Sequence, residues 1–232
     1  MPTPLLAEQV AYYRARAHEY DEWWQRRGRY DRGPETTKQW RAEVEEVERA
    51  LTRFAPMGHV LELAGGTGWW TQHLARVAAS LTCIDASPET IAINRQRLAD
   101  ANLALPAYVE ADIFEWRPSE RYDVVFFSFW LSHVPADRFD AFWRTVAAAL
   151  KPNGRVFFVD NLRPLQTGTP GTDWPPDDDG VQKRALNDGR TFRVVKLFYE
   201  SDELAARLQH LGWRASCAAT QRFLLYGEAS LA

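Results

Sequence analysis

Residues 59–90 read HVLELAGGTGWWTQHLARVAASLTCIDASPET, and they contain two short apolar runs, HVLELA at 59–64 and LTCIDA at 81–86. The first run ends at a glycine-rich turn, after which WWTQHLARVAA shows a helical pattern. A strand, a turn and a helix that lead to a second strand form a βαβ unit, which places the two strands parallel in one sheet. The stretch therefore predicts the start of a mostly parallel α/β sheet.

The same alternation continues on the carboxyl side of this stretch. Ser87 and Pro88 favour a helix start, because serine caps a helix and proline suits its first turn. The later segments are apolar runs at 107–113 (AYVEADI), 123–131 (DVVFFSFWL) and 155–161 (RVFFVDN), with a helix at 136–150 that stops at a KPNG turn. Nearly continuous apolar runs are typical of strands buried on both faces.

A last helix closed by Gly212 and strand-like segments at 213–219 and 221–227 complete the pattern. We therefore predict a doubly wound, mostly parallel, seven-stranded α/β sheet with helices on both faces.

The segments outside this alternation predict additions to the sheet. Apolar positions in three-to-four spacing predict one or two helices over 5–27 and another over 36–54. Asn187-Asp188-Gly189 is a hairpin signal that follows a stretch rich in proline, glycine and aspartate. We expect a single domain over 1–232, divided into a helical cap (1–55), a cofactor-binding core (56–161), an inserted loop and hairpin that cover the site (162–195) and a C-terminal helix with strands (196–232).

The composition argues against several classes of protein. A net charge of −3 disfavours a nucleic-acid partner, whose binding needs many Lys and Arg side chains. Cys83 and Cys217 alone form neither a disulfide framework nor a metal cluster, and the five histidines are scattered, so we expect no metal. No run approaches the roughly 20 apolar residues that span a bilayer, and the charged N-terminal stretch is unlike a signal peptide. We expect a cytoplasmic protein, as a monomer or homodimer, that does not contact membranes.

The glycine-rich turn predicts a ligand that contains a nucleoside. Gly65, Gly66 and Gly68 let a ligand lie against bare backbone, with amide groups directed toward it. Asp85 ends the second strand, where a carboxylate accepts hydrogen bonds from both hydroxyls of a ribose.

Three details choose among nucleoside cofactors. A dinucleotide-binding turn carries G-x-G-x-x-G, whereas Thr71 stands at the position of its last glycine. Glu62 precedes the turn inside the first strand, and Asp112 ends the third strand-like run, where it is placed to accept a hydrogen bond from an adenine amino group. These features disfavour a nicotinamide dinucleotide.

The sequence resembles the class I S-adenosylmethionine-dependent methyltransferases. The resemblance covers residues 58–161 and is carried, in order and spacing, by ELAGGTG (62–68), IDAS (84–87), EADI (110–113) and DVVFFSFWLSHVP (123–135) before LKPNGRVFFVD. One departure is Ala64, where the family pattern usually has its first glycine. The resemblance implies S-adenosyl-L-methionine as the cofactor.

It also implies a role for each matching residue. The three glycines would border the methionine part of the cofactor, Asp85 would bind the ribose with Ala86 beside it, and Asp112 with Ile113 would hold the adenine. Ser128 would lie near the methionine amino group.

Two residues keep alternative interpretations. Glu62 either contacts the cofactor or orders the backbone of the loop. Tyr20, in YYRARAHEYD, either folds over the cofactor carboxylate or packs as a core aromatic on an amphipathic helix.

His133 is the candidate for a general base and for acceptor contact. It follows the fourth strand, and an imidazole has a suitable pKa for deprotonating a phenol or an amine near neutral pH. The alternative is a histidine that only braces the loop. Trp130, on the same segment, is the first candidate to line an apolar acceptor pocket, together with Trp23, Trp24 and Trp174.

The predicted function is transfer of a methyl group to the oxygen or nitrogen of a small-molecule acceptor. A protein that binds S-adenosylmethionine without catalysis is one alternative, and a nicotinamide-dependent oxidoreductase is another, disfavoured by Thr71 and Glu62. The identity of the acceptor is not fixed by the sequence, because one aromatic-lined cavity suits many compounds.

Overall fold

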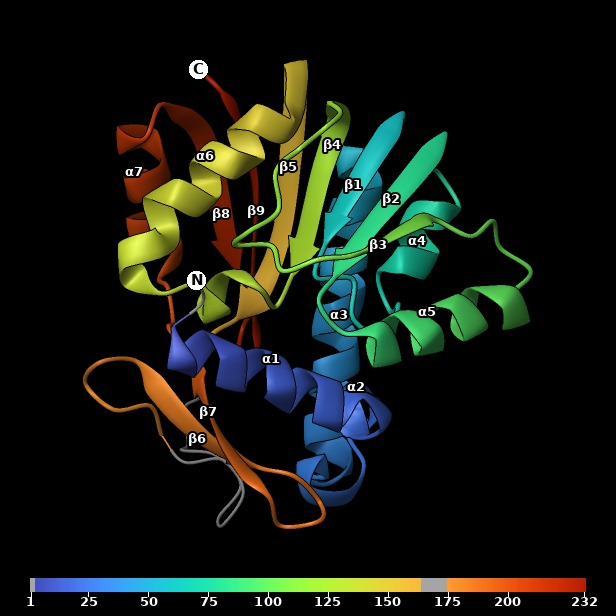
Figure 1. Cartoon of the computed structure of the whole chain (residues 1–232), viewed down its shortest axis with the longest axis vertical. Coiled ribbons are helices and arrows are strands. Elements are labelled where there is room, and N and C mark those ends of the chain that lie inside the picture. The colour runs from blue at the N-terminus through green and yellow to red at the C-terminus, as the bar shows by residue number, and fades with distance from the viewer. Residues whose placement is uncertain (1–2, 164–174) are drawn as a thin grey trace.

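The computed structural model describes residues 3–163 and 175–232 and shows a seven-stranded sheet in the order β3-β2-β1-β4-β5-β9-β8 (Figure 1). Only β9 is antiparallel to its neighbours β5 and β8, and the remaining pairings are parallel. The strands are β1 His59–Leu63, β2 Ser80–Asp85, β3 Ala107–Glu110, β4 Tyr122–Ser128, β5 Leu150–Asn161, β8 Trp213–Ala219 and β9 Leu224–Leu231. The predicted fold class, a mostly parallel seven-stranded α/β sheet, is confirmed.

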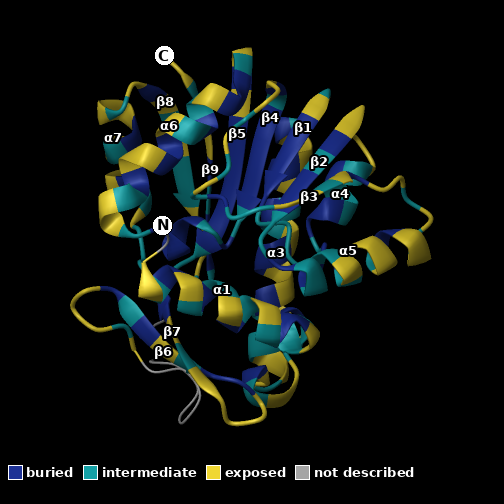
Figure 2. Ribbon diagram, viewed as in Figure 1, coloured by how far each residue is buried: buried dark blue, intermediate teal, exposed yellow. Residues whose placement is uncertain are grey.

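Helices cover both faces of the sheet because its central strands are apolar on both sides. Phe126 and Phe157 face one layer, and their chain neighbours Phe127 and Phe158 face the other. The helices are α3 Pro34–Phe54 and α4 Thr71–Ala75 on the first face, α6 Phe139–Ala149 and α7 Ser201–His210 on the second, and α5 Pro88–Asp100 beside α4. Figure 2 shows the buried strands between helices whose outer surfaces are exposed.

The N-terminal helices and a hairpin lie together at the carboxyl ends of the parallel strands (Figure 1). The cap consists of α1 Pro4–Arg16 and α2 Tyr20–Gln25, and the hairpin of β6 Val181–Ala185 and β7 Thr191–Val195. The hairpin that Asn187-Asp188-Gly189 signals is thus present. Gln9 on α1 accepts a hydrogen bond from the Val195 amide of β7 at 2.9 Å, and Glu8 pairs with Arg193, so α1 and the hairpin form one cover over the sheet edge.

The start of β5 differs from the prediction. β5 begins at Leu150 and includes the KPNG segment that was expected to be a turn after the helix. Leu150 pairs with Tyr122, and the register then shifts before Val124 pairs with Arg155, while Asn153 adopts a left-handed φ of 65°. The segment therefore bends within a strand pairing, because tertiary pairing outweighs the local turn preference of Pro-Asn-Gly.

Candidate active site

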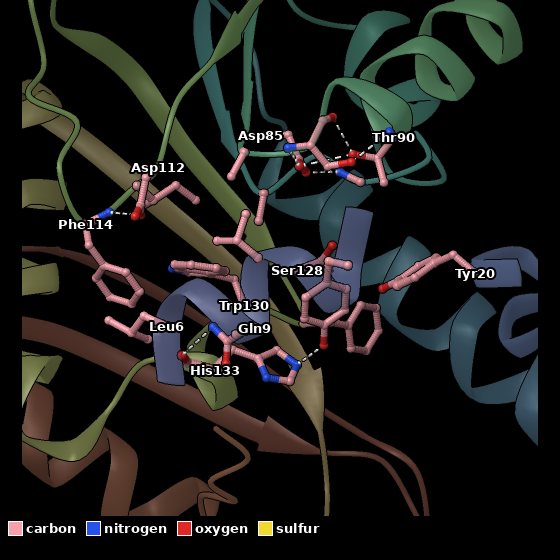
Figure 3. Close-up of a pocket in the computed structure, with 18 residues that line it drawn as sticks. Leu6, Gln9, Tyr20, Asp85, Thr90, Asp112, Phe114, Ser128, Trp130 and His133 are labelled. Carbon is pink, nitrogen blue, oxygen red and sulfur yellow. Dashed lines mark hydrogen bonds between the residues drawn. The ribbon is translucent and has the colours of Figure 1, made fainter. Parts of the chain in front are cut away.

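A cavity lies between the carboxyl ends of β1, β2 and β4 and the cover formed by α1 (Figure 3). Figure 3 shows Asp85 and Thr90 on one side of it, His133 and Gln9 on the other, and Ser128 between them. We call the first side the cofactor half, lined by Ala64, Gly66, Asp85, Ala86, Ser87, Thr90, Asp112, Ile113 and Ser128. We call the second side the acceptor half, lined by Leu6, Gln9, Val10, Tyr13, Phe114, Trp130 and His133, with Tyr20 and Phe129 at the border.

Asp85 organises the cofactor half. Its carboxylate accepts hydrogen bonds from the Gly66 amide at 2.8 Å, the Ser87 amide at 2.9 Å and the Thr90 hydroxyl at 3.0 Å. Ser87 also caps α5 by accepting from the Thr90 amide at 3.1 Å, which fixes the start of that helix. The carboxylate therefore ties the glycine turn after β1 to the start of α5 and borders the cavity, where a ribose can reach it.

Gly65 and Gly68 of the glycine turn leave no room for larger side chains. A Cβ on Gly65 would lie 2.2 Å from the Cys83 Sγ, and one on Gly68 would lie 2.7 Å from the Asn94 side chain. Ala64 adopts a φ of 55°, in the left-handed region that favours glycine, which explains why the family pattern has glycine there. Of the three predicted glycines, Gly66 lines the cavity, whereas Gly65 and Gly68 shape the turn behind it.

Glu62 lies fully buried beneath the turn. Its Oε2 atom has no hydrogen-bond partner among the residues that the structure describes. Burial raises the pKa of Glu62 to about 8. Thr71 and Cys83 hydrogen-bond to the Glu62 carboxyl, and Glu62 is not among the residues that line the cavity, so it lies behind the turn that borders the cofactor half.

The remaining predicted cofactor residues meet at neighbouring strand ends. Asp112 follows β3 and accepts a hydrogen bond from the Phe114 amide at 2.9 Å, and Ile113 and Ser128 border the same cavity. Tyr20 also lines it and packs its ring 4.9 Å from the Arg16 guanidinium. The structure thus brings these residues into one cavity wall, together with Asp85 and Ala86.

His133 lies in the acceptor half with both ring nitrogens engaged. Nδ1 is 2.5 Å from the Val195 carbonyl, and Nε2 is 2.6 Å from the Tyr13 hydroxyl. Arg184 of β6 donates to the same hydroxyl at 3.2 Å. Burial lowers the pKa of His133 well below 6.5, and the charges of Lys196, Arg184 and Arg16 lower it further. The imidazole is therefore neutral at physiological pH.

Trp24 does not reach the cavity, contrary to its predicted contact with the acceptor. It is 5% exposed and stacks on Trp69 at a centroid distance of 4.6 Å, where it anchors α2 to the sheet. Trp23 packs in the same cluster, against Trp40. Trp130 does line the acceptor half, and Trp174 lies outside the described residues.

The sequence reasoning missed the residues of α1 in the acceptor half. Tyr13 and Gln9 contact His133, from which they are separated by 120 and 124 residues. The aromatic pair Tyr12-Tyr13 was visible in the helical pattern, but no local signal connects it to His133. Only the packing of α1 over the sheet edge makes that connection.

Across residues 3–163 and 175–232, no three His, Cys, Asp or Glu side chains are grouped so that they can hold a metal ion. None of the helices in those ranges combines the length and apolar character that a bilayer crossing requires.

A family model and a curated relative that match this chain are both described as methyltransferases. A family model described as "Methyltransferase domain" matches residues 60–154. The ubiquinone biosynthesis O-methyltransferase of Xanthomonas euvesicatoria pv. vesicatoria (strain 85-10) is 30% identical over 114 residues, which cover 48% of this chain and 46% of that protein. The chain thus aligns with less than half the length of this curated relative.

Two solved structures match along nearly the whole chain. A DhpI–SAH complex is 36% identical and covers 100% of this chain and 98% of its own, with a TM-score of 0.76. A DhpI–SAM–HEP complex is 34% identical and covers 99% of each chain, with a TM-score of 0.78.

Proposed function

Because this chain belongs to the class I S-adenosylmethionine-dependent methyltransferases, we propose that it methylates an oxygen or nitrogen atom of a small-molecule acceptor held in the acceptor half. One observation carries the proposal: a single cavity joins the Asp85 side to an apolar and polar wall made of Leu6, Trp130 and the Tyr13–His133 pair. Such a cavity holds a small compound against the cofactor and excludes water.

The cofactor-binding residues of this chain have distinct tasks in the proposal. Asp85 would bind the ribose, Asp112 and Ile113 the adenine, and the turn at Gly66 with Ser128 the methionine part. When bound, S-adenosylmethionine supplies a methyl group activated on a sulfonium. Leu6, Phe114 and Trp130 would orient the acceptor and exclude water, which raises the effective concentration of the reacting atoms.

We further propose that His133 is the base that takes up the proton released by the reaction. Burial and nearby cations lower the pKa of His133 well below 6.5, so the imidazole is neutral near pH 7 and can serve as a proton acceptor, although a weak one. A histidine that only braces the loop is the alternative for this residue.

A methyl-transfer assay tests the proposed function. The whole chain is incubated with methyl-labelled S-adenosylmethionine and a panel of phenols, alcohols, amines and carboxylates, and products are identified by mass spectrometry. We expect labelled product from one acceptor class, with the label on oxygen or nitrogen. Binding of S-adenosylhomocysteine without transfer to any class, or label on carbon, would contradict the proposal.

A further inference from the structure

The hydrogen bonds of His133 determine which nitrogen carries its proton. The Val195 carbonyl can only accept, so Nδ1, at 2.5 Å, must be the protonated nitrogen. In a neutral imidazole Nε2 is then a bare acceptor, and the hydroxyl of Tyr13 donates to it at 2.6 Å. Neither nitrogen of His133 is therefore available to contact an acceptor directly.

Tyr13 is the polar group of this pair that can still bind an acceptor. Its hydroxyl donates to His133 and accepts from Arg184 Nη1 at 3.2 Å. A hydroxyl oxygen has two lone pairs and accepts up to two hydrogen bonds while it donates one. Because Tyr13 lines the cavity, an O–H or N–H group of an acceptor can donate to this oxygen.

We propose that Tyr13 is a catalytic residue that receives the acceptor's proton as it passes its own hydroxyl proton to His133. This inference rests on the proposed methyl transfer to a protonated oxygen or nitrogen. The electron pair of the broken X–H bond stays on the acceptor atom and forms its bond to the methyl group, while sulfur keeps the electron pair of the broken S–C bond. The acceptor's proton ends on Tyr13 Oη, and the former Tyr13 proton ends on His133 Nε2.

Burial of Tyr13 favours a relay over an ionised tyrosine, whereas the nearby Arg184 and Arg16 act in the opposite direction. Burial raises the pKa of Tyr13 to about 12, so the phenol does not lose its proton to solvent near neutral pH. In the relay Tyr13 gains one proton as it gives up another and never becomes a buried anion. His133 gains a positive charge near Lys196, Arg184 and Arg16, and the reaction removes one positive charge from the donor, so the net charge of the cavity does not change.

Gln9 in the cover holds His133 in position for the relay. Gln9 on α1, one helical turn before Tyr13, donates to the His133 carbonyl at 3.2 Å and accepts from the Val195 amide at 2.9 Å. The Gln9 side chain therefore binds both His133 and Val195, the residue whose carbonyl determines which nitrogen of His133 carries the proton. In this scheme Gln9 is a positioning residue, His133 takes up the proton that leaves Tyr13, and only Tyr13 touches the acceptor.

The test compares Tyr13→Phe with a matched control, Tyr12→Phe. The Tyr12 hydroxyl is buried and has no hydrogen-bond partner in the part of the chain that the structure describes, so its removal leaves the relay intact. The relay predicts that Tyr13→Phe lowers kcat/KM for a phenol about 100-fold or more, while kcat/KM for benzoate, which needs no proton removal, changes little. Between about pH 6.5 and 8.5 the wild-type rate with phenol stays flat, whereas that of Tyr13→Phe rises about tenfold per pH unit, because only ionised phenol reacts.

A second measurement is independent of the acceptor. In the ¹⁵N spectrum of histidine-labelled whole chain, His133 should show a protonated Nδ1 and a hydrogen-bonded, unprotonated Nε2, and Tyr13→Phe should shift Nε2 alone. The proposal is overturned by a protonated Nε2, by wild-type rates in Tyr13→Phe, or by a wild-type chain that methylates only oxyanions such as benzoate. Failure of the wild-type chain to bind S-adenosylhomocysteine would instead count against the proposed function, and the ¹⁵N spectrum still decides the geometry of the relay in that case.

Discussion

The two halves of the cavity are built by different means. In the cofactor half, Asp85 binds the Gly66 amide 19 residues away and the Ser87 amide two residues away. In the acceptor half, Tyr13 meets His133 across 120 residues, and Gln9 meets Val195 across 186. One half is assembled from successive strand ends, and the other from three distant segments.

This difference predicts how the two halves of the cavity should respond to substitutions. The cofactor half depends on the sheet itself, where the carboxyl ends of parallel strands meet at a fixed place. The acceptor half depends on the docking of α1 and the β6–β7 hairpin on that edge. Substitutions should therefore separate cofactor affinity from turnover. Three of them test the separation in order of expected effect, and a fourth, at Glu62, tests the burial of an acid beneath the cofactor half.

The largest effect is expected for Asp85→Asn. The substitution removes the charge that accepts three hydrogen bonds and would bind the ribose. Hydrogen bonds to a charged group are each worth about 1.5–3 kcal/mol, so affinity for S-adenosylhomocysteine should fall about 100-fold or more in calorimetry. Asp100→Asn, an exposed change at the end of α5, is the control, and equal affinities of the two variants would break the assignment of Asp85.

A smaller loss of affinity is expected for Gly65→Ala. The new methyl group would meet the Cys83 Sγ at 2.2 Å, so the turn must move. Cofactor affinity should drop about tenfold, consistent with an overpacking cost of about 1–3 kcal/mol. Cys83→Ala in the same chain removes the clashing sulfur and should restore most of the affinity, and a double variant as weak as Gly65→Ala would refute this account of the turn.

The third prediction concerns pH and Glu62. The folded pKa of about 8 lies above the ordinary value of 4.5, so between these pH values the folded chain holds a proton that the unfolded chain has lost. The free energy of unfolding of the ligand-free protein should therefore be highest below about pH 4.5, as far as this group is concerned. It should fall as pH rises to about 8, by up to about 1.4 kcal/mol per pH unit. Urea titrations at several pH values should show this slope flattened in Glu62→Gln.

Calorimetry of ligand binding distinguishes the two interpretations of Glu62. If Glu62 contacts an ammonium group of the ligand, binding of S-adenosylhomocysteine at pH 7 should release a proton, and the calorimetric heat should depend on the buffer. Heats that are independent of the buffer in both wild type and Glu62→Gln would leave Glu62 as a residue that only orders the loop.

The smallest effect on cofactor binding is expected for Gln9→Leu, which breaks the cover. The His133 carbonyl and the Val195 amide would each lose a hydrogen bond, at a cost of about 1–3 kcal/mol per group left unpaired. Turnover should fall several-fold while affinity for S-adenosylhomocysteine stays within about twofold. A parallel loss of both quantities would show that the halves are not independent.

The sequence predicted that most residues of the cofactor half lie at neighbouring strand ends, because its signals are local. A glycine turn between an apolar run and a helix, and an acidic residue at the end of the next run, specify their own positions relative to the sheet. The strands, the α5 cap at Ser87 and the hairpin at Asn187-Asp188-Gly189 were found in the same way. The KPNG segment was misplaced because pairing with β4 outweighs a local turn signal.

The acceptor half was predicted poorly for the opposite reason. Nothing in the chain near Tyr13 indicates that its hydroxyl meets His133, since α1 gains that position only by docking. Trp24 was placed in the cavity by residue type alone, whereas its ring is needed to anchor α2 on Trp69. Aromatic composition does not distinguish a pocket wall from a core anchor.

The central claim is that the Gly66 turn, Asp85 and Asp112 together hold an adenosyl sulfonium compound. Calorimetric titration of the whole chain with S-adenosylhomocysteine, and separately with NAD, tests it most directly. The account predicts one binding event per chain in the micromolar range for S-adenosylhomocysteine and no heat for NAD. Absence of heat with S-adenosylhomocysteine, or equal binding of both compounds, would contradict it.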